Sequence, residues 1–297
     1  MKASETSSVT GRKYGIQRVC KAWGIARSTL YHNRCKQRSE LPRAKPGPKP
    51  IIADDELLSD IREVIDESPF AGEGYRKIYA RLKRKGCVRF SQGRVLRLMK
   101  ENSLLSPYRV EVNKAKAHDG RITTDVPNEM WATDATKILT CEDGWVWFFG
   151  VVEHWNAQCM GWHLSKNGDR FAALEALANG LRSEYGSIDR QVATGLKLRM
   201  DHGSQFKSES FRKQAQYWGI TPSFGYVREP ETNGVIERFH RTLKEQVIHG
   251  RTYRTVEDVR AAVDEFIKLY NKEWLIGKLG YQSPIEARTA WKNRDAA

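Results

Sequence analysis

The apolar residues of the first hundred positions recur mainly at the spacing of amphipathic helices. In residues 14–34, Gly24 permits a tight turn and Ser28 can cap the helix that follows it. The segment therefore predicts a helix-turn-helix within residues 1–35, although an ordinary helical hairpin would give the same pattern. The apolar positions that recur at helical spacing before the turn are Ile16, Val19, Cys20 and Trp23.

A second helical region is predicted over residues 54–105. The stretch DDELLSDIREVIDES places its apolar residues on one helical face, and GYRKIYARLKRKG ends at Gly86. Ser91 is a good cap for a third helix, QGRVLRLMKEN. The intervening residues 36–53 contain four Pro and several cations, which predicts a basic linker without regular structure.

The pattern changes after a second linker, residues 106–126. Three runs rich in β-branched and aromatic residues predict successive strands: EMWATDATKILT, GWVWFFGVVEHW and AQCMGWHLS. Asp143-Gly144 supplies the first turn. Helices then alternate with two shorter strands, so residues 127–250 are expected to form an α/β layer structure with a mixed five-stranded sheet. Residues 251–297 are expected to add a C-terminal helix and a tail.

Composition adds an uneven distribution of charge. The net charge is +14, and residues 1–126 hold 27 Lys and Arg against 14 Asp and Glu, whereas residues 127–297 hold 23 against 22. A basic part joined to a balanced part favours binding of a polyanion by the first part. A lysine-rich, merely soluble surface is the alternative.

The cysteines and the hydropathy restrict the class of protein. The five Cys are scattered without a CxxC pair, which favours free thiols in a reducing cytoplasm and gives no support to a zinc site. No apolar run approaches the ~18 residues of a membrane-spanning helix. We therefore expect a cytoplasmic protein with no membrane partner.

Candidate DNA contacts come from both helical regions. The second helix of the first region opens with four polar residues that could meet bases or phosphates: Arg27, Ser28, Thr29 and His32. The second region has a basic outer face made of Arg81, Lys83, Arg84, Lys85, Arg94 and Arg97. From it we take Arg84 and Lys85 as candidates. Solvated surface charge is the alternative for all of them.

Three acids lie where rigid elements would hold them. Asp134 interrupts the first strand, Asp201 ends the fourth in LKLRMDHGSQF, and Glu237 lies in the last helix of the α/β part. Mg²⁺ prefers carboxylate oxygens, and two such ions roughly 4 Å apart promote phosphodiester chemistry. Taken singly, each acid also has a structural explanation. Asp134 could protect an edge strand from pairing, Asp201 could be a turn residue, and Glu237 could be a solvated residue of a helix.

Several motifs together resemble a known family. They are WATDAT, GWVWFFGVVEHWNAQCMGWHLS, DHGSQF, NGVIERFHRTLKEQ and YNKEWLIGKLGYQSPIEA. Residues 127–285 resemble the catalytic domain of the retroviral-integrase superfamily, which has an RNase H-like fold, and are most similar to bacterial insertion-sequence transposases of the two-reading-frame type. Residues 70–105 resemble the helix-turn-helix that precedes that domain.

The resemblance implies a DDE transposase that cleaves and joins DNA at element ends. It identifies Asp134, Asp201 and Glu237 as catalytic, metal-binding residues for two Mg²⁺ (or Mn²⁺) ions. The implied partners are double-stranded DNA, as terminal inverted repeats and target, and further copies of the chain in a homo-oligomer on DNA. Pairing with or fusion to an upstream-frame protein, and a nucleoid-associated place in the cytoplasm, are also implied.

The last helix of the α/β part offers further candidates for contact with DNA. Asn233 lies one helical turn before Glu237, and Arg241 and Lys244 follow on or near the same face. A solvated basic face is the alternative for the two cations. The function itself also has alternatives: a sequence-specific DNA-binding regulator, a plain RNase H-type nuclease, or a catalytically decayed transposase.

Two segments depart from the family pattern. After the second strand the family has an acid followed by a small polar residue, whereas this chain has Glu153-His154. Between YN and LGY the family commonly has Arg-Pro-His, whereas this chain has Trp274-Leu275-Ile276, so a cationic contact to DNA is expected to be missing there.

Overall fold

The computed structural model describes residues 5–38, 51–87, 90–106, 123–224 and 233–295, and these form two compact units, residues 1–50 and 51–297. The first unit contains α1 (Gly15–Ala22) and α2 (Arg27–Arg38), in agreement with the two helices predicted for residues 14–34. Most of the predicted linker, residues 36–53, lies outside the described residues.

Trp23, which the helical spacing of apolar residues includes, lies just after α1 and is 61% exposed. One detail predicted for this first unit is wrong. Ser28 lies inside α2 and cannot cap it, because the carbonyl of Ala26 already accepts from the N–H of Thr29 and of Leu30. Among the apolar residues of α1, Val19 and Cys20 are buried. The unit therefore has a very small core.

The second unit begins with three helices, as predicted: α3 (Asp54–Glu67), α4 (Tyr75–Arg84) and α5 (Gln92–Glu101). The Ser91 hydroxyl accepts from the N–H of Arg94 at 3.2 Å, which confirms the predicted cap. Gly86 follows α4 with φ +87°, a conformation that suits glycine. The helices enclose a core of Leu57, Ile61, Val64, Ile78, Leu82, Val95, Leu98 and Met99.

A mixed five-stranded sheet forms the centre of the second unit, as predicted. Its strands are β1 (Met130–Thr140), β2 (Gly144–Glu153), β3 (Cys159–Ser165), β4 (Lys197–Met200) and β5 (Thr221–Phe224), in the order β3-β2-β1-β4-β5. β2 is antiparallel to β1 and β3, whereas β4 and β5 run parallel to β1. Asp143 and Gly144 stand at the turn between β1 and β2, as expected.

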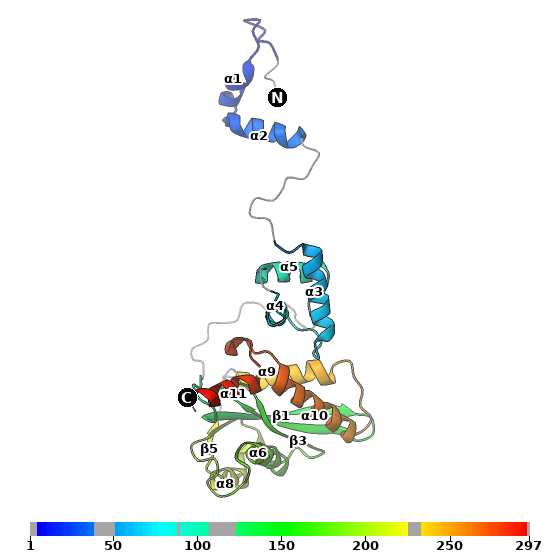
Figure 1. Cartoon of the computed structure of the whole chain (residues 1–297), viewed down its shortest axis with the longest axis vertical. Coiled ribbons are helices and arrows are strands. Elements are labelled where there is room, and N and C mark those ends of the chain that lie inside the picture. Colours follow the sequence, from blue (N-terminus) through cyan, green and yellow to red (C-terminus); the bar gives the residue numbers. More distant parts are fainter. Residues whose placement is uncertain (1–4, 39–50, 88–89, 107–122, 225–232, 296–297) are drawn as a thin grey trace. The chain divides into compact units, whose positions relative to one another are not determined.

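Helices cover both faces of the sheet (Figure 1). On one face, α6 (Arg170–Tyr185) and α8 (Glu209–Tyr217) pack in a core cluster that contains Trp131 and Leu198. On the other, α9 (Gly234–Leu243) and α10 (Val256–Glu273) pack in a cluster that contains Ala132. Side chains of β1 alternate between the two faces. α10 belongs to the same core as the sheet, so this structural body continues past residue 250.

Shorter elements complete the unit. They are α7 (Ser204–Lys207), the π-helical turn η3 (Lys244–Ile248), the 3₁₀ turn η4 (Gly277–Leu279) and α11 (Pro284–Asp295). Within the ranges given above, none of the helices combines the length and apolar character that a membrane span requires.

Candidate active site

The register of two parallel strands brings Asp134 and Asp201 to the same level of the sheet. β1 and β4 pair as far as Ala132 opposite Arg199, and each acid lies two residues further along its strand direction. Neighbouring strands are about 5 Å apart. Because residues two apart share a face, Asp134 is directed to the α9 face with Ala132.

Asp201 also acts as a turn residue, which was the alternative that its sequence context allowed. One carboxylate oxygen accepts from the N–H of Gly203 at 2.9 Å, which closes a side-chain turn just after β4. Leu198 and Met200 pack in the α6 and α8 cluster, so alternation directs Asp201 to the opposite face, the face of α9. The residue is exposed. The turn therefore holds the acid in place without burying it.

Asp134 and Glu237 lie within electrostatic reach of each other. Burial first, and the negative charge of Asp134 second, raise the pKa of Glu237 above its ordinary value. Oδ1 of Asp134 accepts from the N–H of Ala135 at 2.7 Å, and Oδ2 lies 3.4 Å from Nδ1 of His240. α9 thus presents both a carboxylate and an imidazole to the first acid.

The three acids share one region of the sheet but are not gathered into one cluster. In the described ranges, no three Asp, Glu, His or Cys side chains lie close enough together to hold a metal ion. The structure therefore associates Asp134 with Glu237, and it leaves Asp201 at the neighbouring strand end.

The predicted DNA contacts of the last helix lie around this site. Asn233 immediately precedes α9, and its side-chain oxygen is buried without a hydrogen-bond partner in the described part of the chain. Arg241 is exposed near the end of α9, and Lys244 begins η3. In the first unit, the four candidates occupy the first two turns of α2 and are all exposed: Arg27, Ser28, Thr29 and His32.

The two candidates on the second helical region take part in ion pairs within the protein. The guanidinium of Arg84 binds both carboxylate oxygens of Glu286, at 3.0 and 2.8 Å, and the carbonyl of Tyr281 at 2.7 Å. Lys85 pairs with Glu63, at 2.9 Å, and with Glu67. Other cations of the basic face are matched in the same way: Arg81 with Glu73, Arg94 with Asp54, and Arg97 with Asp54 and Glu101.

Sequence reasoning missed His240. It singled out residues before and after this position on the same helix, but not the imidazole itself. The available signal was its position three residues after Glu237, which places both side chains on one side of α9.

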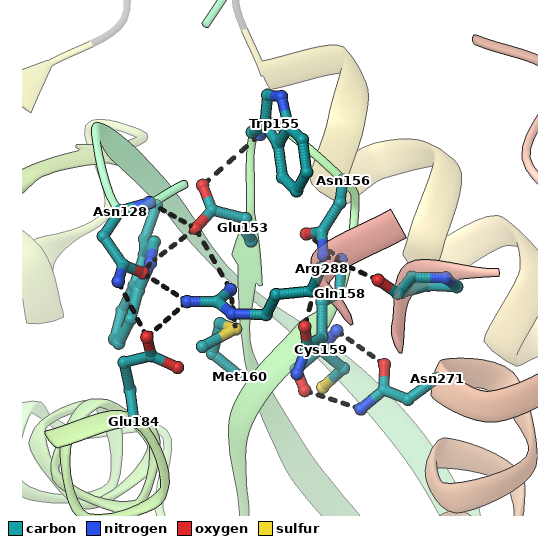
Figure 2. Close-up of polar contacts among 12 residues, drawn as sticks. Asn128, Glu153, Trp155, Asn156, Gln158, Cys159, Met160, Glu184, Asn271 and Arg288 are labelled. Atoms are coloured by element: carbon teal, nitrogen blue, oxygen red, sulfur yellow. Dashed lines mark hydrogen bonds and ion pairs between the residues drawn. The ribbon is translucent and has the colours of Figure 1, made fainter. Parts of the chain in front are cut away.

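The first departure from the family pattern is a buried structural network (Figure 2). Glu153 is fully buried and accepts from the N–H groups of Asn128, at 2.8 Å, and Trp155, at 3.3 Å, and burial raises its pKa. Arg288, from α11, lies 3.7 Å from Glu153 and also pairs with Glu184. Glu153 is paired in register with Trp131, so this network lies near the start of β1, apart from Asp134.

Comparisons with known proteins find two kinds of domain in this chain. Two models described as integrase core domain match residues 125–230 and 218–284, and a model described as HTH-like domain matches residues 53–111. The chain is 27% identical over 289 residues to the transposase for insertion sequence element IS629 of Shigella sonnei, covering 94% of this chain and 93% of that protein.

Further similarities are of the same kind. Transposase InsD for insertion element IS2-9 of Escherichia coli K12 is 26% identical over 298 residues, which cover 93% of this chain and 94% of that protein. The catalytic core domain of BIV integrase is 21% identical, with a TM-score of 0.42 over 57% of this chain and 99% of that one. The chain therefore carries an integrase core domain at residues 125–284, preceded by an HTH-like domain at residues 53–111, and is similar over nearly its whole length to insertion-sequence transposases.

Proposed function

We propose that this protein is a DNA transposase, a DDE polynucleotidyl transferase that cleaves and joins DNA strands at the ends of an insertion sequence. The observation that carries the proposal is the arrangement of Asp134, Glu237 and Asp201 in an integrase core domain: Asp134 and Glu237 interact electrostatically, and Asp201 lies level with Asp134 at the end of the next strand. Similarity to transposases over nearly the whole chain supports the same function.

The donor set suits hard divalent cations. All three proposed ligands are carboxylates, the ligand type that Mg²⁺ and Mn²⁺ prefer, and Asp134 already raises the pKa of Glu237, a repulsion that a bound cation would relieve. We propose that Asp134, Asp201 and Glu237 together hold two such ions. Divalent cations in such a site activate the attacking oxygen and stabilise the leaving oxygen of a phosphodiester.

The proposed chemistry has two balanced steps. In cleavage, a water oxygen attacks the phosphorus at the element end and the bond to the 3′ oxygen breaks. The departing 3′ oxygen takes up one proton and becomes a 3′-hydroxyl, and the phosphate keeps the water oxygen and releases the other proton to solvent. In joining, the free 3′-hydroxyl oxygen attacks a target phosphorus, a target P–O bond breaks, and the departing 3′ oxygen takes up a proton. The protein's own part is to hold the carboxylates and to orient DNA.

Double-stranded DNA is the proposed partner, both as terminal inverted repeats and as target. Arg27, Ser28, Thr29 and His32 are exposed at the start of α2, as reading of an element end requires. Asn233, Arg241 and Lys244 are proposed to contact the strand that reacts. We further propose a homo-oligomer on DNA, pairing with or fusion to an upstream-frame protein, and a nucleoid-associated place in the cytoplasm.

The test is Mg²⁺-dependent cleavage and joining of a labelled duplex that carries the element end. Asp201→Asn removes the charge that holds the cation, yet an Asn side chain still offers Gly203 the oxygen that closes the turn. We expect it to abolish both reactions while DNA binding persists. Asp134→Asn and Glu237→Gln should behave alike, and double variants should lose no more than single ones, because the residues act as one unit.

The matched control is Glu209→Gln. Glu209 is an exposed acid of α8 that pairs with Lys213, at 2.8 Å, so its removal should leave cleavage and joining unchanged. Strand joining by the Asp201→Asn variant would show that the assigned residues are wrong. A wild-type protein that binds the element end but shows no metal-dependent reaction would instead be a regulator or a decayed transposase, and cleavage without preference for the end would indicate a nuclease.

A further inference from the structure

We infer that His240 is a positioning residue that holds the Asp134 carboxylate, through its Nδ1–H, in the orientation in which that carboxylate can bind a divalent cation. The inference rests on the proposed function, since it assumes that Asp134 is a metal ligand. It concerns a residue that the family resemblance does not assign.

The contact involves both oxygens of Asp134. Oδ1 accepts from the N–H of Ala135, its own neighbour in β1, at 2.7 Å. Oδ2 faces Nδ1 of His240 at 3.4 Å. One of these nitrogens comes from the strand and the other from α9, the helix that also bears Glu237. Contacts from separate elements restrict rotation of the carboxylate, and they link its orientation to the placement of α9.

The imidazole lies in a space that the sheet leaves open for it. Gly150 is paired in register with Asp134 on the adjacent strand. A Cβ atom at Gly150 would lie 3.4 Å from Nε2 of His240 and 3.0 Å from the Phe148 ring. The imidazole is 6% exposed and meets Phe148 edge to face, with ring centroids 5.7 Å apart. Neighbours on β2 thus fix the ring in one position beside the acid.

The hydrogen-bonding state of the ring follows from its partner. Nδ1 is the ring nitrogen that faces Oδ2 of Asp134, and an imidazole nitrogen that carries a hydrogen is a donor that a carboxylate oxygen can accept. Nε2 is buried and has no hydrogen-bond partner in the described part of the chain. Burying such a nitrogen costs free energy that an apolar side chain of the same shape would avoid. A ring that served only to fill the core would therefore be better replaced by Phe, and the contact with Asp134 is what the imidazole adds.

Three variants of the full chain separate positioning from packing. Asn places its amide nitrogen near the position of Nδ1 and keeps the donor. Gln places its amide near Nε2 instead, and Phe keeps the ring shape without any donor. Each variant is first checked by its thermal unfolding. The main measurement is Mn²⁺ affinity by calorimetry without DNA, and the second is the Mg²⁺ concentration that gives half-maximal cleavage of the element end.

We expect H240Q and H240F to weaken Mn²⁺ binding and to raise the half-maximal Mg²⁺ concentration by roughly 10–100-fold, as loss of a group that orients a metal ligand does. H240N should stay within about threefold of wild type. If H240F does not fold, the comparison of H240N with H240Q decides. Equal Mn²⁺ affinity in H240Q and wild type, or an equal loss in H240N and H240Q, would overturn the inference.

Failure of this inference is distinguishable from failure of the proposed function. Mn²⁺ binding that is abolished by Asp134→Asn but unchanged by H240Q and H240F would remove the role of His240 and leave the metal site. Absence of Mn²⁺ binding in the wild type would overturn both.

Discussion

Two acids of neighbouring strands, Asp134 and Glu153, lie in different environments. Asp134 lies in β1 and remains partly exposed, whereas Glu153, at the end of β2, is fully buried. For Glu153, burial outweighs the N–H donors and the nearby Arg288, so its pKa lies above the ordinary value of 4.5. A buried acid with a raised pKa makes stability depend on pH.

The pH dependence of Glu153 has a definite sign. Because its folded pKa is raised, the folded state binds the proton more tightly than the unfolded state does, and stability falls as pH rises from about 4.5 through the folded pKa. Glu153→Gln lacks this titration. The free energy of unfolding of the variant, relative to wild type, should therefore increase with pH. Urea unfolding at several pH values from 4.5 to roughly 8 measures it.

The control for this measurement is again Glu209→Gln, because Glu209 is exposed on α8. Its difference from wild type should stay nearly constant over the same pH range. A constant difference for Glu153→Gln as well would contradict the raised pKa.

Arg288 gives the complementary prediction. It is buried between Glu153 and Glu184 and also donates to the side chain of Asn128 at 2.9 Å. Arg288→Met keeps much of the volume but leaves two carboxylates without their cation. Removal of one partner from a buried ion pair costs about 3–5 kcal/mol. Thermal or urea unfolding should show that loss, and a variant as stable as wild type would show that the network contributes no net stability.

At this scale the sequence could identify acids but not their partners. Asp134 interrupts a strand pattern and Asp201 ends one, but it was the family resemblance that selected these two together with Glu237. The contact of Asp134 with His240 depends on how α9 lies across β1 and β2. The pairing of Glu153 with Arg288 joins residues far apart in the chain. Such contacts arise from tertiary packing, which a local pattern does not contain.

At the scale of elements, the Trp274-Leu275-Ile276 segment, which departs from the family pattern, makes an apolar contact with another helical region. Trp274, which follows α10, is 9% exposed and meets the ring of Phe70 edge to face, with centroids 4.9 Å apart. Lys77 Nζ lies 2.7 Å from the centre of the Trp274 ring. Phe70 and Lys77 belong to the HTH-like domain. The residue that replaces a family cation thus joins that domain to the α10 side of the core.

We expect Trp274→Ala to destabilise the protein by about 3–5 kcal/mol, the usual cost of truncating a buried aromatic residue. Phe70→Ala should also destabilise it, and the double variant should lose less than the sum, because the two rings touch. Thermal unfolding of the four proteins measures the coupling. Trp145→Ala is the control: Trp145 is 57% exposed and should change stability little. Additive losses would mean that the rings do not interact.

Element boundaries were predictable where a single local interaction decides them. The Ser91 cap of α5 was found because a hydroxyl three residues before a helical N–H is a local feature. The Ser28 cap failed because α2 starts two residues earlier than such a cap implies, at Arg27, where the preceding residue is Ala26 and has no capping side chain. Runs of β-branched and aromatic residues predicted β1 and β2, but their order with β4 and β5 in the sheet came only from the structure.

At the scale of the whole molecule, the positive charge is concentrated further than the sequence pattern first indicated. Residues 1–53 contain twelve Lys and Arg against two Asp and Glu, whereas residues 54–105 contain eleven against nine. In the second region, Arg84, Lys85, Arg94 and Arg97 all form ion pairs with nearby acids. Most cations of the first region have no acid within their own segment to pair with. Residues 1–53 are therefore the stronger candidate for contact with DNA phosphates.

This difference predicts which cations govern the salt dependence of DNA binding. Two triple variants of the full chain, each changing Lys or Arg to Gln, compare the regions: Arg12, Arg18 and Lys21 in one, Arg84, Lys85 and Arg97 in the other. All three cations of the first set are exposed. Each phosphate contact contributes about 0.9 to the slope of log affinity against log salt concentration. The first variant should flatten that slope by roughly 1–3, because its cations displace counterions from DNA. The second should change it less, since its cations must first leave Glu286, Glu63 and Asp54.

Fluorescence anisotropy with a labelled duplex between roughly 50 and 200 mM salt gives both slopes. Equal flattening by the two variants would mean that DNA displaces the acids, and a larger effect of the second would place the main phosphate contacts on the HTH-like domain.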